Sequence, residues 1–398
     1  MKLTTVSVIR CPEYDRAQLR RALREALAPL PPESWHRPPG ATVLLKPNLL
    51  SSHDTPEAAV NTHPEFVRAV AEIFLEQRCR VIIGDSCGSL SPGSTAQAIR
   101  TTGLDKVAAD LGVELADFDR APAEEIPIPE GKVLKRLRLP KLLRDVDLLV
   151  TLPKFKTHGL TLLTGAVKNQ LGLVAGNGKK EVHRSAPHPR EIARAMVDLY
   201  SVVRPGVAIM DAVVGMEGNG PAGGSARKAG LVLASADCVA LDAVAADLMG
   251  CKPGVVLTTR FADESGLGVG RLDQIEVVGA PLDQIRIPDW RKPPPFVRSL
   301  LFTLLPDWFV RWAYNVVGGA CASVMDDRCI LCGECVANCP AKAFREVGGR
   351  LKVEQSLCIS CYCCSEVCKN RAILMRRPIA GRIVHGVYHL AAGRRMKK

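Results

Sequence analysis

Eight cysteines near the C-terminus fall into two runs with the same spacing. Each run reads C-x2-C-x2-C-x3-C, the first from Cys329 to Cys339 and the second from Cys358 to Cys368, 29 positions further on. Such crowding of thiols indicates metal ligation in a reducing compartment, because disulfide frameworks belong to short secreted chains. Three thiolates from one short loop suit an iron–sulfur cube, whereas structural zinc sites usually pair two C-x2-C knuckles. The predicted chemistry is therefore electron transfer.

The spacing resembles that of bacterial ferredoxins with two clusters, in which the fourth cysteine of each run binds the other cluster. The resemblance implies two [4Fe–4S] clusters in a small α+β ferredoxin-like domain over residues 321–375. A hairpin expected at Gly348-Gly349, between the runs, agrees with that fold. The implied ligands are Cys329, Cys332, Cys335 and Cys368 for the first cluster, and Cys358, Cys361, Cys364 and Cys339 for the second.

Two positions depart from the ferredoxin pattern. Cys363 is surplus, because only the frame through Cys364 keeps the full spacing, and we expect a spare buried thiol there. Lys369 stands where the first run has Pro340. A cation beside Cys368 favours the reduced state of its cluster, so we expect the two clusters to differ in potential.

The long region before the cysteines alternates between short apolar runs and helical patterns. The runs expected to form buried strands are ATVLLKPNLL, RVIIGDS, RDVDLLVTLPK, GVAIMDAVV and AGLVLAS. The helical patterns cover residues 64–77, 94–111, 189–203 and 238–249. This alternation predicts an α/β domain over residues 1–290, with a mostly parallel sheet and flanking helices. Ligands of such sheets bind beyond the carboxyl ends of the strands.

Polar side chains gather where several of these strands end. Their ammonium and amide groups suit a small anionic ligand, such as a carboxylate or a phosphate. The predicted ligand-binding residues are Lys46, Asn48, Asp85, Ser86, Lys154, Lys168, Asn169, Glu217 and Asn219. The predicted catalytic residues are His158, Lys156, His63 and Asp211. The two histidines could transfer protons, since imidazole titrates near neutral pH.

Other chemistries compete for the same residues. A metal site could be built from His63, His158, Asp85 and Asp211, although no short ligand spacing supports it. Cys87 is either a redox thiol or a small buried hydrophobe. The stretch GNGPAG, which begins at Gly218, matches a dinucleotide-binding fingerprint, but Pro221 and the strand that follows argue against it.

A set of short motifs resembles those of the family called "domain of unknown function 362". They are Lys46-Pro47-Asn48, His63-Pro64, Gly84-Asp85-Ser86, Lys154-Phe155-Lys156-Thr157-His158, Lys168-Asn169 with Gly172, Asp211 with Glu217-Gly218-Asn219-Gly220-Pro221, and Ser235-Ala236-Asp237. The resemblance spans about residues 1–285. It implies an α/β fold, often followed by a ferredoxin module, and no particular reaction.

The ends of the chain bear on its location. The N-terminus lacks an apolar secretion segment, so we expect a cytoplasmic protein. Residues 291–320 are apolar but interrupted by charges and a proline, which favours a helical connector or an interfacial membrane helix over a membrane span. Much of the net charge of +12 comes from the C-terminus, including a basic tail over residues 376–398. Such a tail favours solvent, the inner face of an anionic membrane or an acidic protein over nucleic acid.

These patterns together predict an iron–sulfur oxidoreductase, specifically a reductase. Its two clusters would relay electrons between an external protein partner and a small anionic substrate or cofactor in the α/β domain. Fusion in one chain keeps the effective concentration of the donor high. Two alternatives remain open: an electron-transfer subunit that docks to a partner enzyme, and a non-redox acid–base enzyme whose clusters sense redox state or support the fold.

Overall fold

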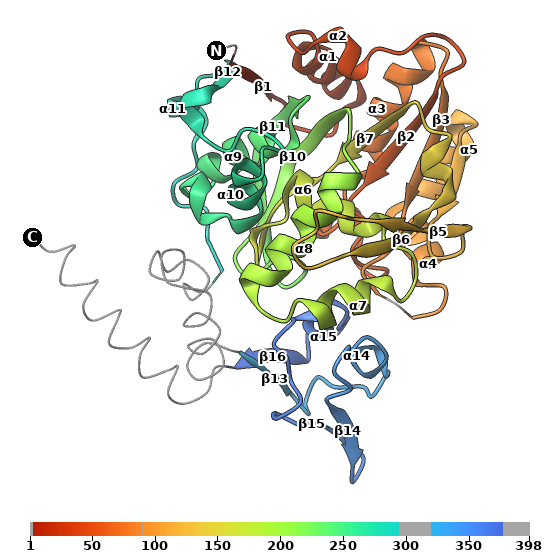
Figure 1. Ribbon diagram of the computed structural model, residues 1–398, viewed down its shortest axis with the longest axis vertical. Coiled ribbons are helices and arrows are strands. Elements are labelled where there is room, and N and C mark those ends of the chain that lie inside the picture. Colours follow the sequence, from red (N-terminus) through yellow and green to blue (C-terminus); the bar gives the residue numbers. More distant parts are fainter. Residues whose placement is uncertain (1–2, 90, 294–319, 377–398) are drawn as a thin grey trace, which may run out of the picture.

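The computed structural model describes residues 3–89, 91–293 and 320–376. A large α/β domain comes first, and a small domain with the cysteine runs lies against one end of it (Figure 1). Ten strands form the sheet of the large domain. They are β1 (Thr4–Arg10), β2 (Thr42–Pro47), β3 (Arg80–Asp85), β4 (Glu114–Asp117), β7 (Leu148–Leu152), β8 (Lys154–His158), β9 (Leu162–Leu163), β10 (Val207–Glu217), β11 (Ser225–Ser235) and β12 (Ile275–Gly279).

Parallel pairing dominates this sheet. Its order is β12-β1-β11-β10-β7-β2-β3-β4, and β8 and β9 attach beside β10. The neighbours from β10 through β7, β2 and β3 to β4 all run parallel. Strand β11 runs antiparallel to both β1 and β10. The predicted α/β class with a mostly parallel sheet is confirmed.

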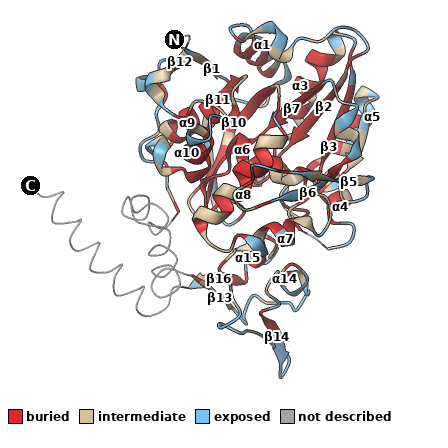
Figure 2. Ribbon diagram, viewed as in Figure 1, coloured by how far each residue is buried: buried red, intermediate tan, exposed pale blue. Residues whose placement is uncertain are grey.

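Helices cover both faces of the sheet, because successive strand residues point to opposite sides. Val43 and Leu45 of β2 pack in one core with α1 (Arg16–Leu27), α3 (Pro64–Glu76), α4 (Ser94–Thr102) and α5 (Leu104–Leu111). Leu44, between them, packs in a second core with α8 (Pro189–Val202). Residues of α6 (Gly165–Asn169), α9 (Cys238–Leu248) and α10 (Leu257–Glu264) pack against β1, β10 and β11. Figure 2 shows the buried residues concentrated in the strands of the sheet.

The helix expected over residues 94–111 is divided in two. Gly103 has φ +79° and stands between α4 and α5. Because this left-handed conformation suits glycine and ends an α-helix, the apolar periodicity continues across the break while the backbone does not. The other short elements of the large domain are α2 (Pro32–Trp35), α7 (Gly178–Ser185), α11 (Leu282–Ile285), β5 (Ala123–Pro127) and β6 (Arg136–Pro140).

The small domain consists of short antiparallel pairs around the cysteines. Its elements are β13 (Cys321–Val324), α14 (Glu334–Ala337), β14 (Phe344–Val347), β15 (Arg350–Val353), α15 (Cys363–Glu366) and β16 (Ile373–Arg376). Strand β13 pairs with β16, and β14 pairs with β15 across the predicted turn at Gly348 and Gly349. The expectation of a small cysteine-bearing α+β domain is confirmed.

The last described part of the large domain is held tightly to it. Trp290 is 1% exposed and packs edge-on against Phe155 of β8, with ring centroids 5.0 Å apart. Most of the predicted connector over residues 291–320, and all of the basic tail over residues 376–398 except Arg376, lie outside the described residues. Within the described ranges, no helix is long and apolar enough to cross a membrane.

Candidate functional site

Each predicted cysteine quartet lines one cavity of the small domain. Cys329, Cys332, Cys335 and Cys368 line the first, and Cys358, Cys361, Cys364 and Cys339 line the second. The fourth cysteine of each run therefore reaches the cavity of the other run. The backbone N–H groups of Ala343 and Ala372 donate to the Sγ atoms of Cys339 and Cys368, at 3.3 and 3.2 Å. Hydrogen bonds to the sulfurs are a general feature of iron–sulfur sites, so these residues fit two clusters.

The two cysteine loops repeat each other in backbone conformation as well as in spacing. Leu331 and Ser360, which are 29 positions apart, have φ values of +53° and +56°. Gly333 and Tyr362 have φ values of +77° and +68°. Left-handed backbone is costly for a residue with a side chain, so its recurrence at equivalent positions indicates that the loop shape is required.

The surplus thiol lies outside the second cavity. Cys364 is buried and lines that cavity, whereas the Sγ of Cys363 lies 3.9 Å from the carbonyl oxygen of Cys361. Cys363 is half-buried rather than buried as expected, and the frame through Cys364 stays a prediction that the cavity lining supports.

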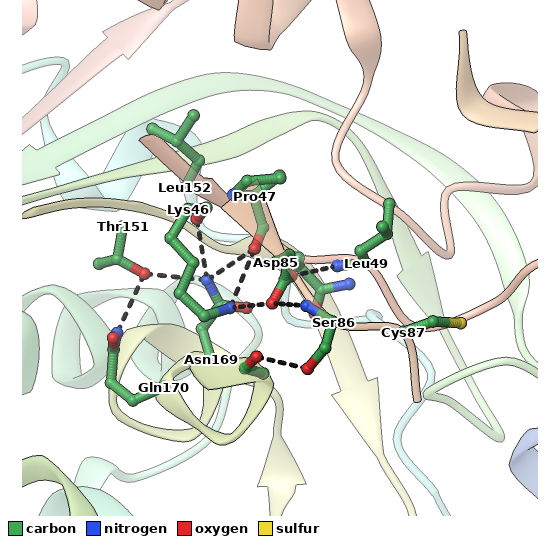
Figure 3. A network of polar contacts seen from close by, with 12 residues as sticks. Lys46, Pro47, Leu49, Asp85, Ser86, Cys87, Thr151, Leu152, Asn169 and Gln170 are labelled. Atoms are coloured by element: carbon green, nitrogen blue, oxygen red, sulfur yellow. Dashed lines mark hydrogen bonds and ion pairs between the residues drawn. The ribbon is translucent and has the colours of Figure 1, made fainter. Parts of the chain in front are cut away.

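A buried ion pair joins the ends of β2 and β3 (Figure 3). The Nζ of Lys46 lies 2.8 Å from Oδ1 of Asp85, and both side chains are at most 2% exposed. The other carboxylate oxygen of Asp85 accepts the N–H of Leu49, and Ser86 donates its hydroxyl to the carbonyl of Gly172. A Cβ at Gly172 would lie 2.0 Å from Asp85 Oδ1, which explains why glycine stands there.

Asn169 ties α6 into the same network. Its Nδ2 donates to Oγ1 of Thr151 on β7 at 2.9 Å and to the carbonyl oxygens of Lys46 and Pro47. Lys46, Asp85, Ser86 and Asn169, four of the predicted ligand-binding residues, are thus brought together. Their polar groups are hydrogen-bonded or ion-paired within this network, which fixes three loops at the strand ends.

A second buried pair lies between β8 and β10. The Nζ of Lys154 lies 2.7 Å from Asp211 Oδ2, and both side chains are fully buried. Tyr14 donates its hydroxyl to Asp211 Oδ1 at 2.8 Å and stacks on His63, with ring centroids 3.7 Å apart. Burial lowers the pKa of His63 to about 4, so its ring is neutral at pH 7. The sequence gives no local signal for Tyr14.

Lys156 differs from the other two buried lysines of the strand ends. Its Nζ donates to the carbonyl oxygen of Val60 at 2.6 Å, and no carboxylate lies within ion-pair distance of it among the described residues. Asn48 donates its Nδ2 to the same carbonyl. Burial, together with the nearby charge of Lys168, lowers the pKa of Lys156 well below its usual value.

The end of β8 meets the small domain at His158. The Nδ1 of His158 accepts the backbone N–H groups of Leu160 and Thr161, so the ring proton belongs on Nε2. That Nε2 lies 3.3 Å from Oε1 of Glu366, on α15. Neither of these two buried atoms has a well-directed hydrogen bond to any described residue. Burial and the charge of Lys168 lower the pKa of His158 to about 4.

Further basic groups surround the same carboxylate. Lys168 of α6 lies near Glu366 and Cys363, and burial lowers its pKa while the carboxylate raises it. Burial lowers the pKa of His183, on α7, to about 4, and its buried Nδ1 has no hydrogen-bond partner among the described residues. The interface therefore collects Lys156, His158, Lys168 and His183 around Glu366, from elements far apart in the sequence. Spacing alone gave no sign of His183 or Glu366.

Tyr362 connects the second cysteine cavity to the large domain. It lines that cavity and also packs against the apolar core that contains Leu44 and α8. A Cβ at Gly159, directly after β8, would lie 3.3 Å from its ring. One residue thus contacts both sides of the domain interface.

The remaining predicted residues lie apart from this interface. Glu217, at the end of β10, is bound by Arg227 at 2.9 Å and by Arg291 at 2.6 Å, and these contacts lower its pKa although burial opposes that. Asn219 is exposed in the loop that follows. Cys87 is fully buried, and burial raises its pKa to about 12, which fits a buried hydrophobe.

The structure does not assemble the proposed metal site. His63 and Asp211 lie together, but Asp85 is paired with Lys46, and His158 faces Glu366. Across the described part of the chain, no group of three or more His, Cys, Asp or Glu side chains is arranged to hold a single metal ion. The cysteine quartets line cavities instead, as a four-iron cube requires.

Comparison with known proteins covers both domains. Residues 43–247 match the family model "Domain of unknown function (DUF362)", and residues 321–369 match "4Fe-4S dicluster domain". The chain is 30% identical over 290 residues to "Thylakoid-associated protein sll1697" of Synechocystis sp., which covers 73% of this chain and 88% of that protein.

Two further similarities are more limited. The chain is 47% identical over 47 residues to "Indolepyruvate oxidoreductase subunit IorA" of Archaeoglobus fulgidus, which covers 11% of this chain and 7% of that protein. The apoprotein of lactate racemase from Thermoanaerobacterium thermosaccharolyticum superposes with a TM-score of 0.37 at 15% identity, over 53% of this chain and 50% of that one. The long matches show that the chain belongs to the DUF362 family and ends in a 4Fe-4S dicluster domain, which implies two [4Fe–4S] clusters.

Proposed function

We propose that the chain is an iron–sulfur reductase that passes electrons from its second cluster to a small anionic ligand held by the α/β domain. The observation that carries this proposal is the direct contact between the loop of the second cysteine run and the end of β8. Tyr362 touches both sides, and Glu366 lies 3.3 Å from His158. Electron transfer weakens steeply with distance, so a cofactor loop packed on a polar site favours transfer between them.

We assign the ligand site by asking which buried lysine has no carboxylate partner among the described residues. Lys46 and Lys154 are neutralised by Asp85 and Asp211, so they have little attraction left for a ligand. Lys156 has no such carboxylate, and a buried ammonium without a counter-charge is costly. We therefore assign the anion to the side of the interface formed by Lys156, His158 and Lys168.

Each of these residues has a distinct role in the proposed reaction. The clusters supply single electrons. Lys156 and Lys168 hold the ligand by hydrogen bonds, and the negative charge of the ligand favours the protonated form of both amines against the effect of burial. His158 carries its proton on Nε2, at the interface, where it can donate a hydrogen bond to a ligand atom that gains negative charge.

Paired variants test this assignment. Lys156→Ala and His158→Ala should keep full cluster content, because the cysteine ligands lie in the other domain. Each should weaken ligand binding by roughly 1.5–3 kcal/mol, or about 10- to 150-fold, as expected for a lost hydrogen bond to a charged group. The measurements are iron analysis, and calorimetric titration with a small molecule identified by mass spectrometry in anaerobically prepared protein. Unchanged affinity in both variants would contradict the site.

A second candidate function is supported by the internal ion pairs. Lys46 and Lys154 are both paired with carboxylates of the same chain. Such internal pairing is expected of a domain that docks to a partner but performs no chemistry. In that case the chain is an electron-transfer subunit, and anaerobic preparations would contain a partner enzyme and no organic ligand. A non-redox acid–base enzyme would instead turn over its ligand with oxidised clusters.

We also propose an external redox protein as partner and peripheral contact with a membrane. The relative in Synechocystis is named thylakoid-associated, which supports the membrane contact. The segment over residues 296–318 and the basic tail are the proposed points of contact, and apart from Arg376 both lie outside the described residues. Sedimentation of the full chain with anionic vesicles tests this.

A further inference from the structure

The loop of the first cysteine run exposes apolar side chains. Ile330 is 56% exposed, Leu331 45% and Val336 44%. Among the described residues, these are three of the seven large hydrophobic side chains that are exposed. Ile330 and Leu331 line the mouth of the first cysteine cavity, where Cys332 is also exposed. Exposed apolar side chains beside a cofactor site are typical of an interaction surface.

The second cysteine loop provides an internal comparison. Leu331 corresponds to Ser360, and both adopt left-handed backbone. Ser360 is 4% exposed, whereas Leu331 is exposed to solvent. The polar residue is thus buried and the apolar residue exposed, the reverse of what folding alone favours. Because the backbone shape is shared, the choice of leucine is not explained by the loop itself.

Charge around this patch identifies its partner. Arg328 and Lys369 line the first cavity, and both are exposed, as is Arg371 nearby. The carboxylate of Glu334 is turned away, because Ser89 and Ser91 of the large domain donate their hydroxyls to it at 3.0 and 2.6 Å.

Two acidic residues precede Arg328 in the sequence. Asp326 is paired with Arg350 at 3.2 Å, and Asp327 lies 4.0 Å from Arg328. The rim of the patch therefore combines apolar side chains with a net excess of basic groups. Such a rim complements an acidic surface, and electrostatic attraction of this kind mainly raises the rate of association.

We infer that this face is the docking surface for a small acidic electron-transfer protein of the ferredoxin class, which reduces the first cluster. In each encounter, one electron leaves the reduced cluster of the partner and enters the first cluster, and it then passes to the second cluster. Two encounters supply the pair of electrons that a two-electron reduction needs. Only the transfer of electrons from the first cluster to the second, and on to the ligand, rests on the proposed function. The docking itself depends on the first loop alone.

Two variants test the surface without touching the ligand site. Leu331→Ser copies the second loop and leaves all charges in place. Arg328→Glu combined with Arg371→Glu reverses two charges of the basic rim and leaves Lys369, beside Cys368, in place. The matched control is Lys352→Glu, an exposed lysine on β15 of the same domain. Iron content is measured for all three, so that a variant which fails to assemble is recognised.

The readout is the stopped-flow rate of cluster reduction in the anaerobic holoprotein. The probe is a reduced acidic [2Fe–2S] ferredoxin, compared with reduced methyl viologen, which needs no docking surface. We expect both variants to slow reduction by ferredoxin about tenfold or more at low ionic strength. The charge-reversed variant should also lose most of its salt dependence. Reduction by methyl viologen, and the Lys352→Glu control, should match the parent protein.

Three results would overturn the inference. The ferredoxin rate could remain unchanged in both variants, or fall equally in Lys352→Glu. Alternatively, the variants could lose binding to anionic vesicles while their ferredoxin rate stays normal, which would make the patch a membrane contact. A failure of the proposed function looks different. In that case ferredoxin reduces the clusters normally, and Lys156→Ala has no effect on ligand binding.

Discussion

Buried lysines at the strand ends differ in what neutralises them, and the proposed ligand site rests on this difference. Lys46 and Lys154 each have a carboxylate partner in the chain, and removing either partner would leave an uncompensated buried charge. Lys156 has a backbone carbonyl only. The three residues look alike in sequence, so the distinction comes from strand pairing, which brings Asp85 and Asp211 to two of them.

A difference of one sequence position also distinguishes the predicted cysteine ligand of the second cluster from the surplus cysteine beside it. Cys364 lines the second cavity and Cys363 does not. We expect Cys363→Ala to keep about eight irons per chain after anaerobic reconstitution, and Cys364→Ala to keep about four, since each [4Fe–4S] cluster needs its full set of thiolates. Iron and acid-labile sulfide analysis measures both. The reverse pattern would show that the ligand frame runs through Cys363.

The sequence predicts the cysteine ligands of the clusters more readily than it predicts which side chains contact each other across the fold. The cysteine quartets repeat within short loops, so spacing alone identifies them and the cavities agree. The contact of His158 with Glu366 joins residues more than 200 positions apart, and no local pattern encodes it. The stacking of Tyr14 on His63 is hidden for the same reason. Long-range packing decides which charged side chains are satisfied.

Among the elements, α6 positions much of the interface, and a buried carboxylate holds its first turn. Asp242 of α9 accepts the backbone N–H groups of Ala166 and Val167. Gly165, with φ +59°, leaves room for it, since a Cβ there would lie 2.5 Å from the carboxylate. Lys168 and Asn169 follow on the same short helix. The position of these two side chains therefore depends on Asp242.

This arrangement predicts a pH dependence of stability. Burial raises the pKa of Asp242 from 3.8 to about 7 in the folded protein. Between these values the folded state binds the proton more tightly than the unfolded state does, so the contribution of this group to stability falls as pH rises towards 7. Asp242→Asn has no such proton. The free energy of unfolding of the variant relative to the parent should therefore increase from pH 5.5 to pH 8. Denaturant titration measures it, and a constant difference would contradict the prediction.

Most elements were expected from sequence periodicity, and the exceptions have physical reasons. Strands β2, β3, β7, β10 and β11 fall where apolar runs predicted them. The helix over residues 94–111 breaks at Gly103 because a left-handed residue ends the hydrogen-bond ladder. Strand β8 is not among the strands expected from the sequence, since KFKTH carries two lysines and a histidine. Lys154 is buried because Asp211 of β10 neutralises it, whereas the buried Lys156 has the carbonyl oxygen of Val60 as its partner.

On the scale of the whole molecule, the large domain extends past its last predicted strand. Trp290 is buried beside Phe155, and Arg291 binds Glu217. We expect a fragment that ends at Pro293 to unfold cooperatively on heating. A fragment that ends at Pro288 should unfold at a lower temperature, because it lacks the tryptophan and this ion pair. Equal melting temperatures, measured by circular dichroism, would show that the C-terminal segment adds nothing to the core.

The two clusters have different surroundings and, in the proposed function, different roles. The first cysteine loop touches the large domain through Glu334 and exposes an apolar and basic rim, whereas the second meets the large domain through Tyr362 and Glu366. Lys369 is exposed beside the first cluster, whereas Lys168 is partly buried beside the second cysteine loop. A buried charge is screened less than an exposed one, so the large domain should raise the potential of the second cluster more.

The reduction potential of the second cluster shows whether that cluster faces the proposed site of the α/β domain. The measurement is a potentiometric titration of anaerobic holoprotein, followed by electron paramagnetic resonance. Lys168→Ala is compared with the parent and with Lys132→Ala, an exposed lysine of the same domain. Loss of the Lys168 charge should lower the potential of one cluster by tens of millivolts, roughly the Coulomb energy of a charge at about 10 Å. The other cluster, and both clusters in Lys132→Ala, should be unchanged. If Lys168→Ala leaves both potentials at the parent values, the second cluster does not face the α/β domain as described.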